Sequence, residues 1–209
     1  MTSKKQEKNI PAPIINESWT PNDILYYGPS HRRVSLFTPI MSETALPLIS
    51  QLKELDSRSN ETILLEINTE GGSVTDSFAI YDCIKTLSSP VIGYTTGLCS
   101  SGGLVVLSAC DYRITSSNCM FFYHQPIMTP PTAVLNSSES TDSIQESYAI
   151  FKRMYDRCII NRTKISRQDW ENNFKDKTSK YFNADEALKY GFVDLIDKIK
   201  SKNFKIGIR

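Results

Sequence analysis

A serine and a histidine in this chain of 209 residues have the types and the order needed for nucleophilic catalysis. Ser101 lies in the glycine-rich segment 97–103 (GLCSSGG), and His124 ends a predicted strand further along the chain. A serine hydroxyl is a weak nucleophile, and it needs a neighbouring base to take its proton. These residue types make Ser101 a candidate nucleophile and His124 its candidate general base. Taken by themselves, these residues also allow a glycine-rich turn without chemistry and a purely structural histidine.

Two glycine-rich turns must lie together to build such a site. Segments 61–68 (ETILLEIN) and 90–95 (PVIGYT) are short, apolar and rich in β-branched residues, which is typical of buried strands. Glycines 71–72 follow the first strand, and segment 97–103 follows the second. The carboxyl ends of parallel strands meet at one edge of a sheet, so we expect the two turns to face each other. The helix after the second turn would then offer free N–H groups to a developing oxyanion.

Strands and helices alternate along the chain, which is typical of βαβ units and a mostly parallel sheet. The predicted strands cover 33–38, 61–68, 90–95, 113–115 and 120–123. Ser42 is predicted to cap the first helix. The other predicted helices cover 74–87, the short apolar segment 104–109, 142–161 and 185–190. Gly191 is predicted to end the last of these helices. We expect one α/β domain over 21–197, a flexible N-terminal arm over 1–20 and a basic tail over 198–209.

Composition excludes several classes of function. The 24 Lys and Arg nearly balance the 23 Asp and Glu, and a net charge of +1 offers no electrostatic footprint for nucleic acid. No apolar run approaches the ~20 residues that a membrane-spanning helix needs. Two histidines exclude a three-histidine zinc site, and five cysteines without a CxxC pair argue against a disulfide framework and a zinc ribbon. We expect no metal and no cofactor, and buried free thiols, with a reactive thiol at Cys99 as the alternative.

Several motifs, in a fixed order, carry a resemblance to a known family. They are segments 67–74 (INTEGGSV), 80–82 (IYD), 97–101 (GLCSS), 123–126 (YHQP), 184–187 (ADEA) and 190–194 (YGFVD). With these motifs, the chain from about Arg33 to Asp194 resembles the proteolytic subunit of the Clp protease, a self-compartmentalising serine peptidase. The resemblance implies an α/β fold of the Clp protease/crotonase type, in which βαβ units form a spiral and a handle helix protrudes.

The resemblance also implies roles for individual residues. Ser101 would be the nucleophile, and His124 would be the general base. The backbone N–H groups of Gly72 and Gly102 would form the oxyanion hole. The reaction would be peptide hydrolysis through an acyl-enzyme, without a metal.

The third member of the expected triad departs from the family pattern. The family has an aspartate a few residues before the ADEA element, and counting back from that element reaches Ser179. The loop 176–180 is longer than in the family, so Asp176 is the candidate acid. Otherwise Ser179, another polar group or a backbone carbonyl orients His124. Because a misplaced acid can cost about 10⁴-fold in the turnover of a serine protease, this departure predicts weak or conditional activity.

The resemblance further implies an assembly that works with a separate motor. The chain has no G-x-x-x-x-G-K-[ST] phosphate-binding loop, so protein substrates would be delivered by a hexameric AAA+ ATPase of the Clp type. Peptides and unfolded polypeptides would be cleaved in a heptameric homo-oligomeric ring, in the cytoplasm or an organelle stroma. The stacking of two rings is left open, because Pro130 and Pro131 lack the N–H groups that a strand between rings needs.

Two alternatives come from other classes of protein. One alternative is a catalytically weak or inactive structural subunit of a mixed Clp ring. Ser179 favours this alternative, whereas the retained Ser101 and His124 argue against it. An acyl-CoA enzyme of the related crotonase fold would build its oxyanion hole from similar turns. The serine–histidine pair argues against that alternative as well.

Overall fold

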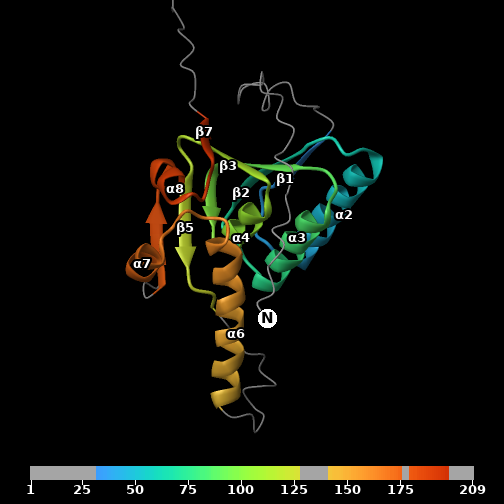
Figure 1. Cartoon of the computed structure of the whole chain (residues 1–209). Helices are drawn as coiled ribbons and strands as arrows, with labels where there is room; N and C mark the ends of the chain where they lie inside the picture. Colours follow the sequence, from blue (N-terminus) through green and yellow to red (C-terminus); the bar gives the residue numbers. More distant parts are fainter. Residues whose placement is uncertain (1–31, 128–140, 176–178, 198–209) are drawn as a thin grey trace, which may run out of the picture.

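The structure is a computed structural model that describes residues 32–127, 141–175 and 179–197 (Figure 1). The expected arm, the expected basic tail, Asp176 and the Pro130–Pro131 pair lie outside these residues.

The described elements alternate between strands and helices over most of the chain. The strands are β1 (Arg33–Leu36), β2 (Ile63–Thr69), β3 (Val91–Ser100), β4 (Tyr112–Ser116), β5 (Met120–His124), β6 (Ser179–Phe182) and β7 (Leu195–Asp197). The helices are α2 (Ser42–Arg58), α3 (Val74–Thr86), α4 (Gly102–Ala109), α6 (Thr141–Ile160), α7 (Arg167–Trp170), the π-helix η1 (Glu171–Lys175) and α8 (Ala184–Tyr190).

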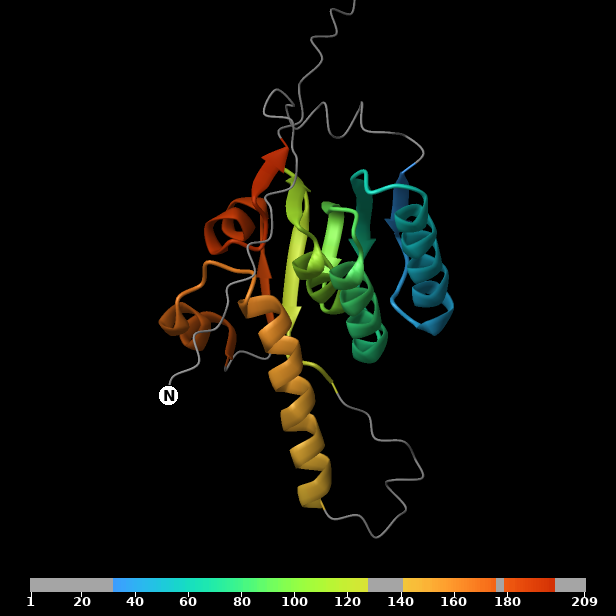
Figure 2. The same cartoon turned by 45° about the vertical axis from the view of Figure 1, so that its right-hand side comes forward.

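The main path of the sheet is parallel and has the order β1-β2-β3-β4-β7. The long strand β3 pairs with β4 along its first half and with β5 along its second half. Strand β5 thus leaves the main path, and it pairs with β6 in antiparallel fashion. Helices α2, α3 and α4 lie over one face of the sheet (Figure 2). This arrangement confirms the predicted α/β fold with a mostly parallel sheet.

The hydrophobic core lies between the sheet and these helices. In β2, Ile63, Leu65 and Ile67 are fully buried in this core, whereas Leu64 belongs to a smaller cluster on the other face. This alternation is the period of two that a strand imposes on its side chains. Helix α4 is apolar all round, and each of its residues is buried, as expected for a helix at the centre of a fold.

Two local predictions need correction. The predicted cap at Ser42 is wrong by one residue, because Met41 takes that position and donates its N–H to Thr44 Oγ1 at 3.1 Å. The predicted turn before Ser101 is also strand, since β3 continues through Ser100. Gly97 has a φ of 59° and lies where the register between β2 and β3 shifts. This shift in register lets β3 continue to Ser100.

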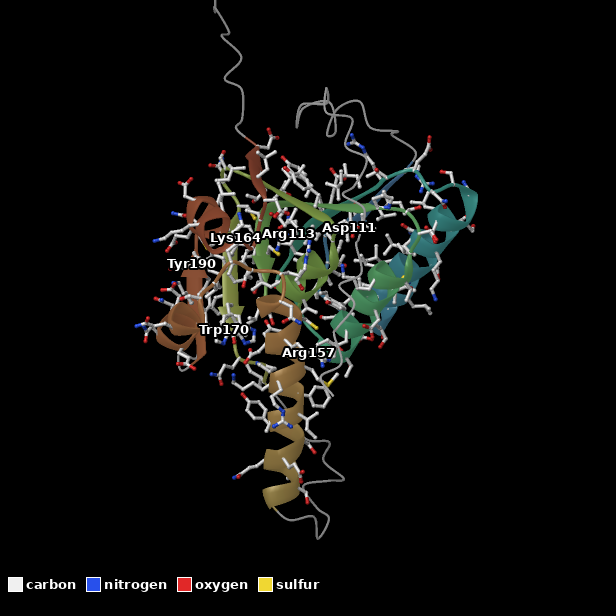
Figure 3. The ribbon with its side chains drawn as sticks, viewed as in Figure 1. Asp111, Arg113, Arg157, Lys164, Trp170 and Tyr190 are labelled. Carbon is white, nitrogen blue, oxygen red and sulfur yellow. The ribbon has the colours of Figure 1, made fainter. Side chains whose placement is uncertain are left out.

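An aromatic cluster supports β5 from the face opposite to that of His124. Tyr123 packs edge-on against Trp170 and Phe174, with ring centroids 5.2 and 5.5 Å apart. Phe174 in turn meets Tyr190 edge-on at 5.6 Å, and Figure 3 labels Trp170 and Tyr190 on this side of the molecule. The cluster fixes the buried face of β5 and therefore the direction of the residues on its other face.

Helix α6 extends away from the sheet in both views (Figures 1 and 2), as predicted for the handle over 142–161. Its C-terminal half is anchored, because Tyr155 and Ile159 are fully buried. Asp156 of the same helix accepts hydrogen bonds from the Tyr123 hydroxyl at 2.8 Å and from Lys152 at 2.7 Å. Among the described helices, none is long and apolar enough to cross a membrane.

Candidate active site

Ser101 joins β3 to α4 in a strained backbone conformation. Its φ of 53° and ψ of −118° make it the one non-glycine residue with positive φ in the described part of the chain. Its N–H donates to the carbonyl of Phe122 at 2.8 Å, and its own carbonyl accepts from the N–H of Leu104 at 2.9 Å. Strain of this kind persists only where the surroundings enforce it, and it often marks functional sites. A serine on a sharp strand-to-helix turn is the geometry of a nucleophile elbow.

The two glycine-rich turns touch each other, as the sequence predicts. A Cβ atom on Gly71 would lie 2.7 Å from Ser101 Cβ and 2.6 Å from the Ser100 carbonyl oxygen. A Cβ atom on Gly72 would collide with the carbonyl oxygen of Ile40. Backbone bonds hold this turn in place, since Ile40 donates its N–H to the Gly71 carbonyl at 2.7 Å. The close approach to Ser101 therefore needs glycine at position 71, and the close approach to Ile40 needs glycine at position 72.

Replacement of Gly71 by alanine is expected to lower the free energy of unfolding by about 1–3 kcal/mol, because the new methyl group has no space and the φ of 88° is unfavourable for alanine. The same change should displace Ser101. Urea unfolding measures the first effect, and the rate of serine-directed labelling measures the second. Exposed Glu70 provides the control, since Glu70→Ala should leave the stability nearly unchanged. Wild-type stability of Gly71→Ala would contradict the described contact.

Two backbone N–H groups that are free to donate indicate an anion-binding site beside Ser101. In the described residues, the N–H groups of Gly72 and Gly102 donate to no other protein group. Gly102 is the first residue of α4, where the helix dipole places partial positive charge. Its nitrogen is only 2.8 Å from the position that a Cβ on Gly71 would take, so the two turns bring these donors into one region. Free N–H groups at such a position suit a developing oxyanion.

His124 reaches the same cavity from β5. The pairing of Ser100 with Phe122 aligns the ends of β3 and β5, and His124 lies two residues beyond this pair. A cavity of about 540 Å³ is lined by Ser101, His124, Gly71 and Gly72. Its other walls are mostly apolar, with one carboxylate, and include Ile40, Met41, Glu70, Val74, Pro126 and Ile127. The structure thus brings three of the predicted site residues, Ser101, His124 and Gly72, around one cavity.

The imidazole of His124 is held by a backbone carbonyl. Its Nδ1 lies 2.7 Å from the carbonyl oxygen of Gln125. Because a carbonyl oxygen can only accept, Nδ1 carries the proton and donates it to this bond. In the neutral imidazole, Nε2 is then the unprotonated nitrogen, which is the one that a general base uses to take a proton from serine. A backbone carbonyl was one of the orienting groups that the sequence left open, and among the described residues the Gln125 carbonyl contacts Nδ1.

The two candidates for the third triad member have different positions. Asp176 lies outside the described residues. Ser179 is the direct partner of His124 in the antiparallel ladder of β5 and β6, and both line a second cavity of about 460 Å³. Counting from the ADEA element therefore finds the position beside His124, and the residue there is a serine.

The aromatic side chains beside His124 were not predicted from the sequence. The ring of Phe122 stacks on the imidazole with centroids 5.3 Å apart, and it stacks on Tyr181 of β6 at 4.1 Å. The signal was present in the alternation of β5 (MFFYH), which places Phe122 and His124 on one face. Tyr181 could not be assigned, because β6 has only four residues and was not predicted.

Tyr155 of α6 is a further residue near Ser101 that was not predicted from the sequence. Its hydroxyl is fully buried and has no hydrogen-bond partner of good geometry among the described residues. Burial raises the pKa of Tyr155, and the hydrogen-bonding influence of the Ser101 side chain opposes this rise. The phenol therefore stays protonated near the candidate nucleophile.

The alternative of a reactive thiol at Cys99 is wrong. The side chain is fully buried, and burial raises the pKa of the Cys99 thiol well above its usual value. A thiol without thiolate character is a poor nucleophile. All five cysteines are free, and Cys99 packs in the core as a small apolar side chain.

Comparisons with known proteins find a matching family model and similar relatives. Residues 20–200 match the family model of the Clp protease. The ATP-dependent Clp protease proteolytic subunit 3 of Synechococcus sp. (strain CC9902) is 33% identical over 153 residues, which cover 71% of this chain and 74% of that subunit. Proteolytic subunit 2 of Prochlorococcus marinus (strain NATL2A) is 34% identical over 153 residues, with 71% and 74% covered.

Among solved structures, a point mutant of ClpP1 from Listeria monocytogenes superposes with a TM-score of 0.70 and 25% sequence identity. The superposition covers 80% of this chain and 92% of that chain. The residues matched by the family model include Ser101 and His124 as well as both candidate positions for the acid, Asp176 and Ser179.

Proposed function

The chain belongs to the Clp protease family of serine peptidases, and on that basis we propose that it is a serine endopeptidase subunit that cleaves peptide bonds through an acyl-enzyme. One observation carries the proposal. Ser101, in a strained turn at the start of α4, and His124, with Nε2 free to accept a proton, line the same cavity.

The geometry supports a reaction in two halves. In the first, Nε2 of His124 takes the proton of Ser101 as Oγ forms a bond with the substrate carbonyl carbon. The N–H groups of Gly72 and Gly102 stabilise the negative charge on the carbonyl oxygen. The peptide C–N bond then breaks, and His124 returns the proton to the leaving amine. In the second half, a water molecule replaces the amine, and hydrolysis of the ester releases the acid and restores Ser101.

The proposed setting is a self-compartmentalised assembly in the cytoplasm or an organelle stroma. Its homo-oligomeric ring would be heptameric, single or stacked, and a Clp-type AAA+ ATPase would deliver unfolded polypeptides. The relatives from Synechococcus and Prochlorococcus are proteolytic subunits of ATP-dependent Clp proteases, which supports this setting. In this assembly the helix α6, which projects from the sheet (Figure 1), would lie between subunits.

A second candidate function is a weak or inactive subunit of a mixed Clp ring. One observation favours it: the residue paired with His124 is Ser179 rather than an acid. Peptidase assays of the isolated chain, and of the chain mixed with a competent Clp subunit, separate the two functions. Turnover by the isolated chain excludes the inactive subunit.

The test of the proposed function is covalent labelling with a fluorophosphonate, which phosphonylates activated serines. We expect the full-length protein to be labelled at Ser101, with the adduct located by peptide mass spectrometry. Labelling should be lost in Ser101→Ala and His124→Ala, because these changes remove the nucleophile and its base.

Ser100→Ala serves as the matched control, since it removes a neighbouring buried hydroxyl and should retain the label. Thermal unfolding must show that each variant is folded. Labelling that persists in either Ser101→Ala or His124→Ala would refute the proposed function.

A further inference from the structure

The face of the β5–β6 ribbon that carries His124 is aromatic. On this face, β5 contributes Met120, Phe122 and His124, and β6 contributes Ser179 and Tyr181. Phe122 is the direct partner of Tyr181 in the ladder, just as His124 is the partner of Ser179. No acidic side chain belongs to this face within the two described strands. The groups beside the imidazole on the ribbon are therefore a serine and a stack of rings.

Phe122 contacts both members of the candidate catalytic pair. Its ring lies over the imidazole of His124, with centroids 5.3 Å apart and an angle of 29° between the planes. Its backbone carbonyl accepts the N–H of Ser101 at 2.8 Å, which holds the strained turn of the nucleophile. The same residue thus supports the base with its side chain and the nucleophile with its main chain.

Tyr181 fixes the ring of Phe122 in turn. The two rings stack at 4.1 Å with planes only 19° apart, which is closer and more parallel than the contact with His124. Tyr181 is itself 63% exposed, so it forms the outer layer of the stack. Offset stacking of this kind restricts the side-chain rotation of the inner ring.

Stacking of Phe122 on the imidazole of His124 favours a reaction in which the imidazole becomes protonated. The face of an aromatic ring attracts a cation within about 6 Å, so it holds imidazolium more strongly than neutral imidazole. Imidazolium forms only as His124 takes the serine proton. An interaction that is stronger in the transition state than in the ground state accelerates the chemical step.

We propose that Phe122, backed by Tyr181, is a positioning residue that orients the His124 ring and stabilises its protonated form in the transition state, in a site where a serine stands opposite the base. This inference rests on the proposed function. It assigns to an aromatic stack a part of the task that a carboxylate performs in a serine–histidine–aspartate triad.

The experiment compares Phe122→Leu with Phe121→Leu in the full-length protein. Phe121 is the neighbouring residue on the opposite face of β5 and is fully buried, so its change should lower the thermal stability and leave kcat of the folded enzyme unchanged. Phe122→Leu should lower kcat and the fluorophosphonate labelling rate about three- to thirtyfold, with little change in KM. Phe122→Trp, which keeps an aromatic face, should retain most of the activity.

A second readout does not depend on catalysis. The chain has only two histidines, so the ring resonances of His124 in a protein with ¹³C-labelled histidine are assigned by comparison with His124→Ala. Loss of the stacked ring in Phe122→Leu should shift these resonances, and Phe121→Leu should leave them in place. A wild-type labelling rate in Phe122→Leu, or an unshifted His124 resonance, would overturn the inference. An unlabelled wild type with a shifted resonance in Phe122→Leu would instead refute the proposed function and, with it, the transition-state role of Phe122.

Discussion

Replacement of Ser101 by alanine is expected to lower peptide turnover by a factor on the order of 10⁴ to 10⁶, because the acyl-enzyme can no longer form. His124→Ala should have an effect of the same order, since Ser101 keeps its proton without a base. The double variant Ser101→Ala/His124→Ala should be no slower than the single variants, because the two residues act as one unit. Steady-state assays with a fluorogenic peptide at high enzyme concentration measure all three.

The geometry of the site explains this lack of additivity. Ser101 and His124 line one cavity, and the N–H groups of Gly72 and Gly102 remain when both side chains are removed. A small residual rate above that of water should therefore survive in all three variants. Multiplicative losses in the double variant would show that Ser101 and His124 act independently, which contradicts the mechanism. The control is Ser100→Ala, which should keep the wild-type rate.

Introduction of an acid at position 179 is expected to raise kcat by at least about tenfold. Ser179 is the direct cross-strand partner of His124, and the Cβ atoms of such a pair lie about 4.5–5.5 Å apart. An aspartate in Ser179→Asp therefore lies within reach of the imidazole. A carboxylate is a stronger acceptor than the Gln125 carbonyl that now bonds Nδ1 at 2.7 Å, and it stabilises imidazolium directly.

Two further variants make this prediction specific. Ser179→Asn has the shape of the aspartate without its charge and should leave kcat near the wild-type value. Asp176→Asn tests the other candidate acid, and it should lower kcat by about 10²-fold or more only if Asp176 already orients His124. No gain in Ser179→Asp, together with a large loss in Asp176→Asn, would show that Asp176 supplies the acid. A gain in Ser179→Asp alone would identify the serine as the cause of weak activity.

Part of this site could be predicted because it depends on short stretches of sequence. Segments 61–68 and 90–95 are apolar enough to be buried strands, and parallel strands end at one edge of the sheet. The contact between Gly71 and Ser101 follows from these two facts. The position of His124 follows in the same way from β5, the second strand after β3, which also pairs with β3 in parallel.

Other parts depend on contacts between segments that carry no clear pattern. Strand β6 has four residues (SKYF), of which only Phe182 is buried, so neither its existence nor its register could be recognised. The pairing of His124 with Ser179 and of Phe122 with Tyr181 depends on that register, and a shift of one residue would move Tyr181 to the other face. The bond between Nδ1 and the Gln125 carbonyl depends on the side-chain rotation of His124, which packing selects.

By itself, the sequence determined the alternation of strands and helices, because backbone preference and hydrophobic period act over a few neighbouring residues. Its short motifs also identified Ser101 and His124 as the candidate nucleophile and base, together with the glycines beside them. Only the tertiary structure decided what surrounds the base. It placed Ser179 rather than an acid opposite His124 and laid Phe122 and Tyr181 beside the ring. The cross-strand contacts join residues more than 50 positions apart, and their geometry is set by the packing of the whole β5–β6 ribbon rather than by any local pattern.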